Sequence, residues 1–247
     1  MPVVNIPGVA PGQLRLTGAL LADIFRGIRP YWDDPVIKSY NPGVNLPHQK
    51  ITVVHRSDGS GTTFLFTTYL SMKAPNWASK VGGNDAVNWP TGLGGKGNDG
   101  VAAFVKQTGG AIGYVEYAYA KQNGMAFAQL QNQGGASVSP SSDTFAAAAA
   151  GADWSKAEGN YMLLINQPGA AVWPITGVTF ILIPQAPKDA AKCGAVLAFF
   201  DWAYRDGDAA AAALDYVPLP GALKNRIRAQ WADVKGPDGK GVYAPKA

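Results

Sequence analysis

Seven residues in the first third of the chain combine groups that bind anions: Arg56-Ser57-Asp58-Gly59-Ser60-Gly61-Thr62. An arginine can donate two parallel N–H bonds to a tetrahedral oxyanion, and the hydroxyls of Ser60 and Thr62 can add further donors. Gly59 and Gly61 lack the Cβ atoms that would keep an anion away from the backbone. The composition of this segment therefore predicts a site for phosphate or sulfate.

The segment lies where a predicted strand, 50–55, meets a predicted helix, 62–72. The start of a helix exposes unpaired N–H groups and the positive end of the helix dipole, so an oxyanion can bind there directly. Asp58 is unfavourable beside an anion unless it accepts hydrogen bonds from Arg56 and holds the guanidinium in place. In the alternative interpretation Asp58 or Ser60 only caps the helix and the arginine lies on the surface.

Two other motifs invite an enzymatic interpretation. Residues 92–97 match the dinucleotide pattern G-x-G-x-x-G, but they follow Trp89-Pro90 rather than a strand, which favours a tight turn and a helix cap. Ser60 lies near His55, but a nucleophile elbow requires glycine two residues before the serine, and this chain has Asp58 there. A serine hydrolase or phosphatase using Ser60 stays an alternative.

The composition narrows the classes of protein further. The 247 residues are 47% hydrophobic and only 15% charged, which excludes a disordered chain. The net charge is +4, but the basic residues are dispersed, so nucleic-acid binding is not indicated. A single cysteine, Cys193, and two histidines argue against a disulfide and against a zinc site. We expect no metal and no cofactor.

Strands and helices alternate along the chain, which predicts an α/β fold. Buried strands are predicted at 111–115 and at 179–183, the second as a continuous apolar run covered on both faces. Asn98 or Asp99 is expected to cap a helix over 100–107, and Asp143 a helix over 144–150. Further helices are predicted at 17–26, 117–122, 188–205 and 220–234.

Much of the chain resembles the periplasmic phosphate-binding proteins, the substrate-binding components of bacterial phosphate ABC importers. The resemblance lies in segments that follow the family's order from about residue 3 onward: LADIFRGIRPYWDDPVI, YNPGVNLP, HRSDGSGTTFLFTTYL, WPTGLGGKGNDGVAAFV, GAIGYVEYAYAKQN, GADWSK, WPITGVTFILI and LAFFDWAY. It implies a type II periplasmic binding protein fold, in which a hinge joins two α/β lobes and phosphate lies in the cleft between them.

The resemblance also implies roles for individual residues. Arg56, Ser60, Gly61 and Thr62 match the family's phosphate contacts, and Asp58 matches the acidic partner of the arginine. The implied protein is a periplasmic monomer and not an enzyme. It binds inorganic phosphate, needs no cofactor, and delivers the phosphate to the permease subunits of an ABC importer. A bare lobe that serves as an interaction module is a second alternative.

The first part of the family's lobe one is not matched. In the family a signal peptide and this part precede the strand that VVNIP resembles, and they carry further phosphate contacts. We therefore expect lobe two at 1–170, the returning half of an incomplete lobe one at 171–247, and exposure of Phe180 and Leu182. With half of the cleft open, the expected free energy of phosphate binding is about 4 kcal/mol, or roughly millimolar affinity, with poor exclusion of sulfate.

Overall fold

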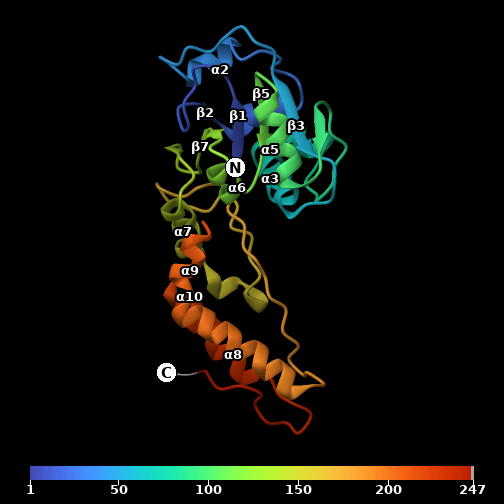
Figure 1. Ribbon diagram of the computed structural model, residues 1–247, viewed down its shortest axis with the longest axis vertical. Coiled ribbons are helices and arrows are strands. Elements are labelled where there is room, and N and C mark those ends of the chain that lie inside the picture. The colour runs from blue at the N-terminus through green and yellow to red at the C-terminus, as the bar shows by residue number, and fades with distance from the viewer. Residues whose placement is uncertain (246–247) are drawn as a thin grey trace. The chain divides into compact units, whose positions relative to one another are not determined.

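The computed structural model describes residues 1–245 and divides into two compact units (Figure 1). The first unit comprises Met1–Gly151 and Leu164–Gly177, and the second comprises Ala152–Leu163 and the chain from Val178 onward. The sequence predicts a single boundary, between residues 170 and 171. That these units are the two lobes of a binding protein stays a prediction.

The first unit is built around a five-stranded sheet with the order β4-β3-β5-β1-β6. Its strands are β1 (Pro2–Asn5), β3 (Thr52–Arg56), β4 (Leu93–Gly95), β5 (Ala111–Tyr114) and β6 (Ala126–Phe127). The strand β3 is parallel to both β4 and β5, whereas β1 is antiparallel to both β5 and β6. The carboxyl ends of β3 and β4 therefore lie at the same edge of the sheet, and each strand leads into a helix there.

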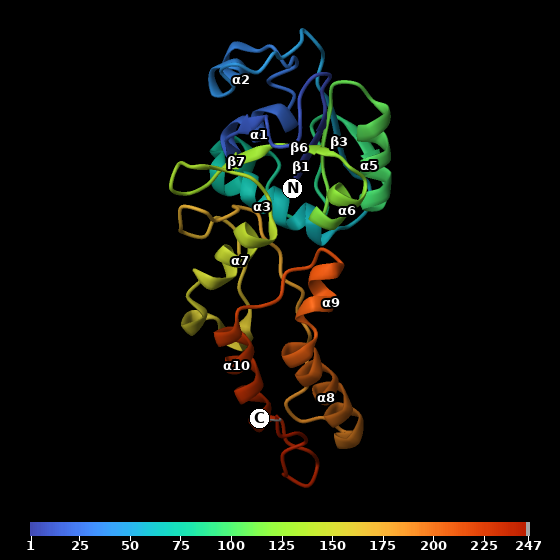
Figure 2. The same ribbon diagram turned by 60° about the vertical axis from the view of Figure 1, so that its left-hand side comes forward.

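Helices and a smaller sheet complete the first unit. The smaller sheet has the order β2-β7-β8 and consists of β2 (Arg15–Leu16), β7 (Gln129–Gln131) and β8 (Ser137–Val138). The helices are α1 (Gly18–Phe25), α2 (Pro35–Tyr40), α3 (Gly61–Lys73), α4 (Pro75–Lys80), α5 (Gly97–Gln107), α6 (Tyr117–Gln122) and α7 (Ser142–Ala150). Figure 2 shows α5 on one side of β1 and β3, with α1 and α3 on the other side.

Aromatic side chains fill the space between the sheet and α3. The ring of Phe66 in α3 stacks on Tyr114 of β5 at 4.3 Å and meets Phe25 of α1 edge-on at 4.8 Å. All three side chains are buried. Burial of large aromatic surfaces fixes α3 against the end of the sheet, which matters because the first turn of α3 belongs to the candidate site.

The caps predicted for two helices are wrong. The N-cap of α5 is Lys96, which makes no side-chain cap bond, rather than Asn98 or Asp99. Ser141 caps α7 through a capping box with Thr144, so Asp143 lies inside the first turn instead. In both cases the helix begins earlier than the apolar periodicity indicated, and the expected capping residue is part of the helix itself.

The second unit is mainly helical. It contains the short 3-10 helices Trp154–Lys156 and Glu158–Asn160, followed by α8 (Ala190–Asp206), α9 (Asp208–Ala213), α10 (Gly221–Gln230) and the 3-10 helix Trp231–Asp233. Its core cluster consists of Cys193, Leu197, Trp231 and Val234. Within the described residues, no helix has the length and apolar character needed to cross a bilayer.

The prediction of a covered strand at 179–183 is wrong. The structure has no strand there, and Leu182 is 92% exposed, with Ile181 at 48% and Phe180 at 38%. The apolar run is able to form a strand, but no neighbouring segment of the described chain pairs with it. The exposure expected for Phe180 and Leu182 is confirmed.

Candidate functional site

The last residue of β3 is Arg56, and its backbone is tied to the start of α3 through Tyr114. The amide of Arg56 donates to the hydroxyl of Tyr114 at 3.2 Å. The same hydroxyl lies 2.7 Å from Oγ1 of Thr63, in the first turn of α3. Burial raises the pKa of Tyr114, so the phenol stays protonated. One buried hydroxyl therefore holds the end of the strand and the start of the helix together.

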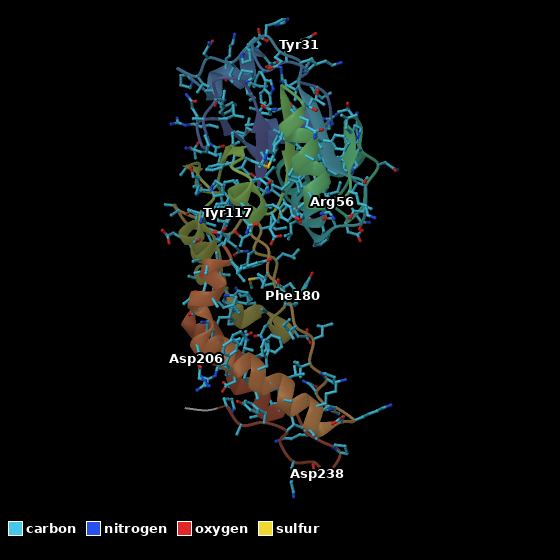
Figure 3. The ribbon with its side chains drawn as sticks, in the orientation of Figure 1. Tyr31, Arg56, Tyr117, Phe180, Asp206 and Asp238 are labelled. Atoms are coloured by element: carbon cyan, nitrogen blue, oxygen red, sulfur yellow. The ribbon has the colours of Figure 1, made fainter. Side chains whose placement is uncertain are left out.

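The guanidinium of Arg56 is held by Asp58 through two hydrogen bonds. Nε donates to Oδ1 at 2.8 Å, and one Nη donates to Oδ2 at 2.7 Å. These bonds lower the pKa of Asp58 well below its usual range and raise that of Arg56, so both groups are charged at neutral pH. Figure 3 labels Arg56, whose side chain is only 11% exposed. The other three N–H groups of the guanidinium donate to no acceptor in residues 1–245.

The carboxylate of Asp58 has a second partner, which supplies a third hydrogen bond. Its Oδ1 also accepts a hydrogen bond from the amide of Gly97, the first residue of α5, at 3.2 Å. A carboxylate at the start of a helix is favourable because it faces the positive end of the helix dipole. Asp58 therefore connects the end of β3 to the start of α5 and cannot turn without breaking both contacts.

The first turn of α3 leaves two amides open. Ser60 is the N-cap, and its Oγ accepts from the amide of Thr63 at 3.3 Å. The amide of Ser60 itself donates to the carbonyl of Asp85 at 3.0 Å. Across the described chain, the amides of Gly61 and Thr62 have no acceptor, as expected for the first positions of a helix. A Cβ built at Gly61 would meet no atom within 4 Å, so the backbone there is accessible.

These groups are the donors of the candidate oxyanion site. The open amides lie at the positive end of α3, and the ion pair with Asp58 leaves one edge of the Arg56 guanidinium without a partner. Charge-assisted hydrogen bonds from such donors are short and strong, and two parallel N–H groups suit a tetrahedral anion. Ser60 therefore caps the helix, as in one interpretation of the sequence, while Arg56 is not a solvent-directed surface residue.

Comparison with known proteins gives the family. A family model described as a PBP superfamily domain matches residues 2–206. A phosphate-binding protein PstS of Pasteurella multocida (strain Pm70) is 51% identical over 244 residues, which cover 98% of this chain and 71% of that protein. The chain belongs to the PstS phosphate-binding proteins of the PBP superfamily.

A second relative supports the same family assignment. A phosphate-binding protein PstS of Xylella fastidiosa (strain Temecula1) is 53% identical over 232 residues, covering 94% of this chain and 64% of that protein. The chain thus spans 64% to 71% of the length of these two relatives.

Solved structures show the fold. A phosphate-binding protein from Stenotrophomonas maltophilia aligns with a TM-score of 0.62 and 21% identity, over 99% of this chain and 73% of that one. A high affinity periplasmic phosphate-binding protein bound with phosphate aligns with a TM-score of 0.66 and 21% identity, over 93% of this chain and 68% of that one. The predicted α/β, two-lobed binding-protein fold is confirmed. The hinge and the incomplete lobe one stay predictions.

The two enzymatic motifs have structural explanations in this chain. Within 92–97, β4 pairs with β3, so part of the segment predicted as a tight turn is a strand. A Cβ at Gly95 would lie 2.7 Å from the backbone of Gly100 and Val101, which means that the glycine allows α5 to pack closely on β4. His55 stacks on Trp89 at 4.7 Å, and its Nδ1 lies 3.0 Å from the carbonyl of Arg56. No hydrogen bond joins Ser60 to a histidine anywhere in residues 1–245.

Tyr114 and the amide of Gly97 were not identified from the sequence as parts of this site. The sequence places Tyr114 only in a buried strand, and Gly97 only in the segment 92–97 that favours a tight turn and a helix cap. A tyrosine at the carboxyl end of a buried strand is the one available signal, because a buried hydroxyl requires a partner. The contact between Asp58 and Gly97 spans 39 residues and has no local signal.

Proposed function

We propose that the chain binds inorganic phosphate at the turn formed by residues 56–62. Arg56, Ser60, Gly61 and Thr62 supply the hydrogen-bond donors, and Asp58 orients the guanidinium. The observation that carries the proposal is the pair of open amides at the start of α3, and the guanidinium of Arg56, which a carboxylate holds in place, supports it. Relatives that are about half identical and carry the name phosphate-binding protein support the same ligand.

We infer that the protein acts in transport rather than in catalysis. Its role is that of a solute-binding protein that captures phosphate in the periplasm and delivers it to the membrane permease subunits of an ABC importer. The names of the relatives and the periplasmic structural neighbour support this role. No metal or cofactor takes part, because the donors of the turn and the helix dipole neutralise the anion.

Titration of the chain with phosphate, followed by NMR, tests the site. Phosphate is expected to shift the amide signals of Gly61 and Thr62 in a saturable manner, together with the side-chain Nε–H of Arg56. Binding that leaves these three signals in place while shifting others would contradict the proposed site. No response to phosphate at all would contradict the proposed ligand.

An enzymatic role for Ser60 makes a different prediction. A phosphatase would hydrolyse p-nitrophenyl phosphate, and Ser60→Ala would abolish the reaction. We expect no turnover, because the Oγ of Ser60 accepts from the amide of Thr63 and has no adjacent base. Turnover that Ser60→Ala removes would replace the transport role with a catalytic one.

A further inference from the structure

The imidazole of His55, next to Arg56 in β3, donates a hydrogen bond to the backbone at the end of that strand. Its Nδ1 lies 3.0 Å from the carbonyl oxygen of Arg56. A carbonyl oxygen only accepts, so Nδ1 carries the proton, and the uncharged ring has its lone pair on Nε2. Burial lowers the pKa of His55, so the ring is uncharged at neutral pH. The ring therefore holds the peptide unit at which the chain leaves β3.

This peptide unit, between Arg56 and Ser57, connects the sheet to the turn. Its amide donates to the carbonyl of Gly95 in β4 at 3.0 Å, and its carbonyl accepts from the ring of His55. On the other side of the Arg56 Cα, the amide of Arg56 donates to the hydroxyl of Tyr114 at 3.2 Å. Hydrogen bonds therefore restrict both backbone torsions of Arg56, and the imidazole supplies one of them.

The direction of the Arg56 guanidinium depends on this backbone. The guanidinium lies at the end of a long side chain, so a small rotation at Cα displaces it much further. Its two hydrogen bonds to Asp58, of 2.8 Å and 2.7 Å, form a parallel pair that requires a defined geometry. The ring of His55 does not share the face of Arg56, because successive side chains of a strand point to opposite faces of the sheet. Its influence on the site therefore acts through the backbone of Arg56.

The ring of His55 has a defined place in the fold. It stacks on Trp89, with the ring centroids 4.7 Å apart and the planes 9° from parallel. A Cβ at Gly92 would lie 3.0 Å from Cδ2 of the ring, and one at Gly94 would lie 3.6 Å from Cε1. The first of these separations is shorter than an ordinary contact between carbon atoms. The absence of a side chain at Gly92 therefore leaves the space that the ring occupies, while the tryptophan covers one face of the ring.

We propose that His55 is a positioning residue of the phosphate site: its Nδ1–H holds the carbonyl of Arg56 and so fixes the direction of the guanidinium toward the anion. This role rests on the proposed binding of phosphate at residues 56–62, and it requires no contact between the ring and the anion. It also gives the first glycine of the 92–97 motif a purpose, because Gly92 makes room for the ring.

Two substitutions separate the hydrogen bond of His55 from its stacking. His55→Asn keeps an N–H donor close to the position of Nδ1 but loses the ring, whereas His55→Phe keeps a ring that can stack on Trp89 but has no donor. Titration calorimetry is expected to show phosphate affinity about fivefold lower in His55→Phe, but less than about twofold lower in His55→Asn. Thermal unfolding is expected to show the opposite order, with His55→Asn the less stable variant, because it loses the aromatic contact.

The matched control is His48→Phe. The ring of His48 also stacks on an aromatic ring, that of Tyr31 at 4.7 Å, and its Nδ1 also lies 3.0 Å from an oxygen, one of the carboxylate of Asp33. His48 precedes β3, whereas Arg56 ends that strand, and Figure 3 labels Tyr31 and Arg56 well apart in the first unit. This variant is expected to bind phosphate as the unchanged protein does. Equal losses of affinity in His48→Phe and His55→Phe would overturn the proposal, as would affinities that follow the melting temperatures of the variants.

NMR of the ligand-free protein separates the role of His55 from phosphate binding itself. The imidazole is expected to carry its proton on Nδ1 and none on Nε2 at neutral pH, and the Nε–H of Arg56 is expected to exchange with solvent faster in His55→Phe than in His55→Asn. If the unchanged protein does not respond to phosphate, the proposed ligand is wrong, and these two signals still decide whether His55 positions Arg56. A proton on Nε2 instead of Nδ1, or equal exchange of the Arg56 Nε–H in the two variants, would contradict the positioning role.

Discussion

The helices α3 and α5 begin alike but satisfy their first amides differently. Each is the next helix after one of two adjacent parallel strands, β3 and β4, and each has glycine as its first residue. At α5 the amide of Gly97 donates to the carboxylate of Asp58, an anion of the protein itself. At α3 the amides of Gly61 and Thr62 have no acceptor in residues 1–245. The same helix-start geometry therefore serves an internal anion in one place and is open to an external one in the other.

Asp58 links the two helix starts. It occupies the start of α5 and, through the same carboxylate, holds the guanidinium of Arg56, which is proposed to face the anion at α3. A negative charge close to the proposed anion site therefore need not weaken it. Because Asp58 is satisfied by an arginine and by a helix amide, its charge is compensated locally.

Loss of Arg56 is expected to have the largest effect on binding. Arg56→Ala removes the only cation assigned to the turn and is expected to weaken phosphate binding by at least about 2 kcal/mol, roughly 30-fold. Arg56→Lys should recover part of the loss, because lysine keeps the charge but not the planar pair of donors. Titration calorimetry measures both. Arg15→Ala is the control, since Arg15 lies in β2 of the other sheet, and equal losses in the two alanine variants would contradict the site.

Asp58→Asn tests the carboxylate that contacts both Arg56 and the start of α5. It keeps the shape of the side chain but removes the charge, so the hold on Arg56 and the contact with Gly97 both weaken. We expect phosphate affinity to fall several-fold, which is less than the loss in Arg56→Ala. The ratio of phosphate affinity to sulfate affinity should also decrease. Hydrogen exchange at Gly97 should become faster in the same variant.

The matched control for this prediction is Asp99→Asn. Asp99 also lies in the first turn of α5, but it makes no hydrogen bond to Arg56. Phosphate affinity should therefore change less than in Asp58→Asn. If Asp58→Asn binds phosphate more tightly than the unchanged protein, repulsion outweighs orientation and the interpretation of Asp58 is wrong.

Much of the fold could be predicted from the sequence, because most elements carry local signals. The helix predicted at 117–122 matches α6, and the strand predicted at 111–115 matches β5 to within one residue. Helical periodicity and flanking glycines are sufficient for such elements. In the site, the strand-to-helix position of Arg56, Asp58 and Ser60 could be inferred for the same reason.

Contacts between distant segments could not be predicted. The strand β4 has the sequence Leu-Gly-Gly, which has no β-propensity, and it is a strand because β3 pairs with it. The apolar run at 179–183 shows the converse, since its composition favours a strand but the described chain supplies no neighbour. Side-chain composition reports what a segment can form, whereas pairing depends on which segments meet.

One serine cap and one threonine cap allow the effect on phosphate binding to be separated from the effect on helix stability. Ser60 caps α3, and Thr17 caps α1 by accepting from the amide of Leu20 at 3.1 Å. Either cap replaced by alanine should lower the free energy of unfolding by about 1 kcal/mol. Only Ser60→Ala should also lower phosphate affinity. Thermal unfolding with and without phosphate measures both quantities, and an equal loss of affinity in Thr17→Ala would show that binding follows helix stability and not the hydroxyl of Ser60.

The smallest expected effect is a change of stability at low pH. The pKa of Asp58 in the folded protein is lowered by the hydrogen bonds from Arg56 and Gly97, below the ordinary carboxyl value of 3.8. A carboxyl with a depressed pKa stabilises the fold above its unfolded value, and this contribution is lost as the pH falls below 3.8 toward the folded value. The difference in melting temperature between the unchanged protein and Asp58→Asn should therefore be constant from neutral pH to about pH 4 and shrink below it. Carbon NMR of the Asp58 carboxyl measures its pKa independently. Half-protonation at or above pH 3.8 would mean that the guanidinium of Arg56 and the amide of Gly97 do not stabilise the charged carboxylate.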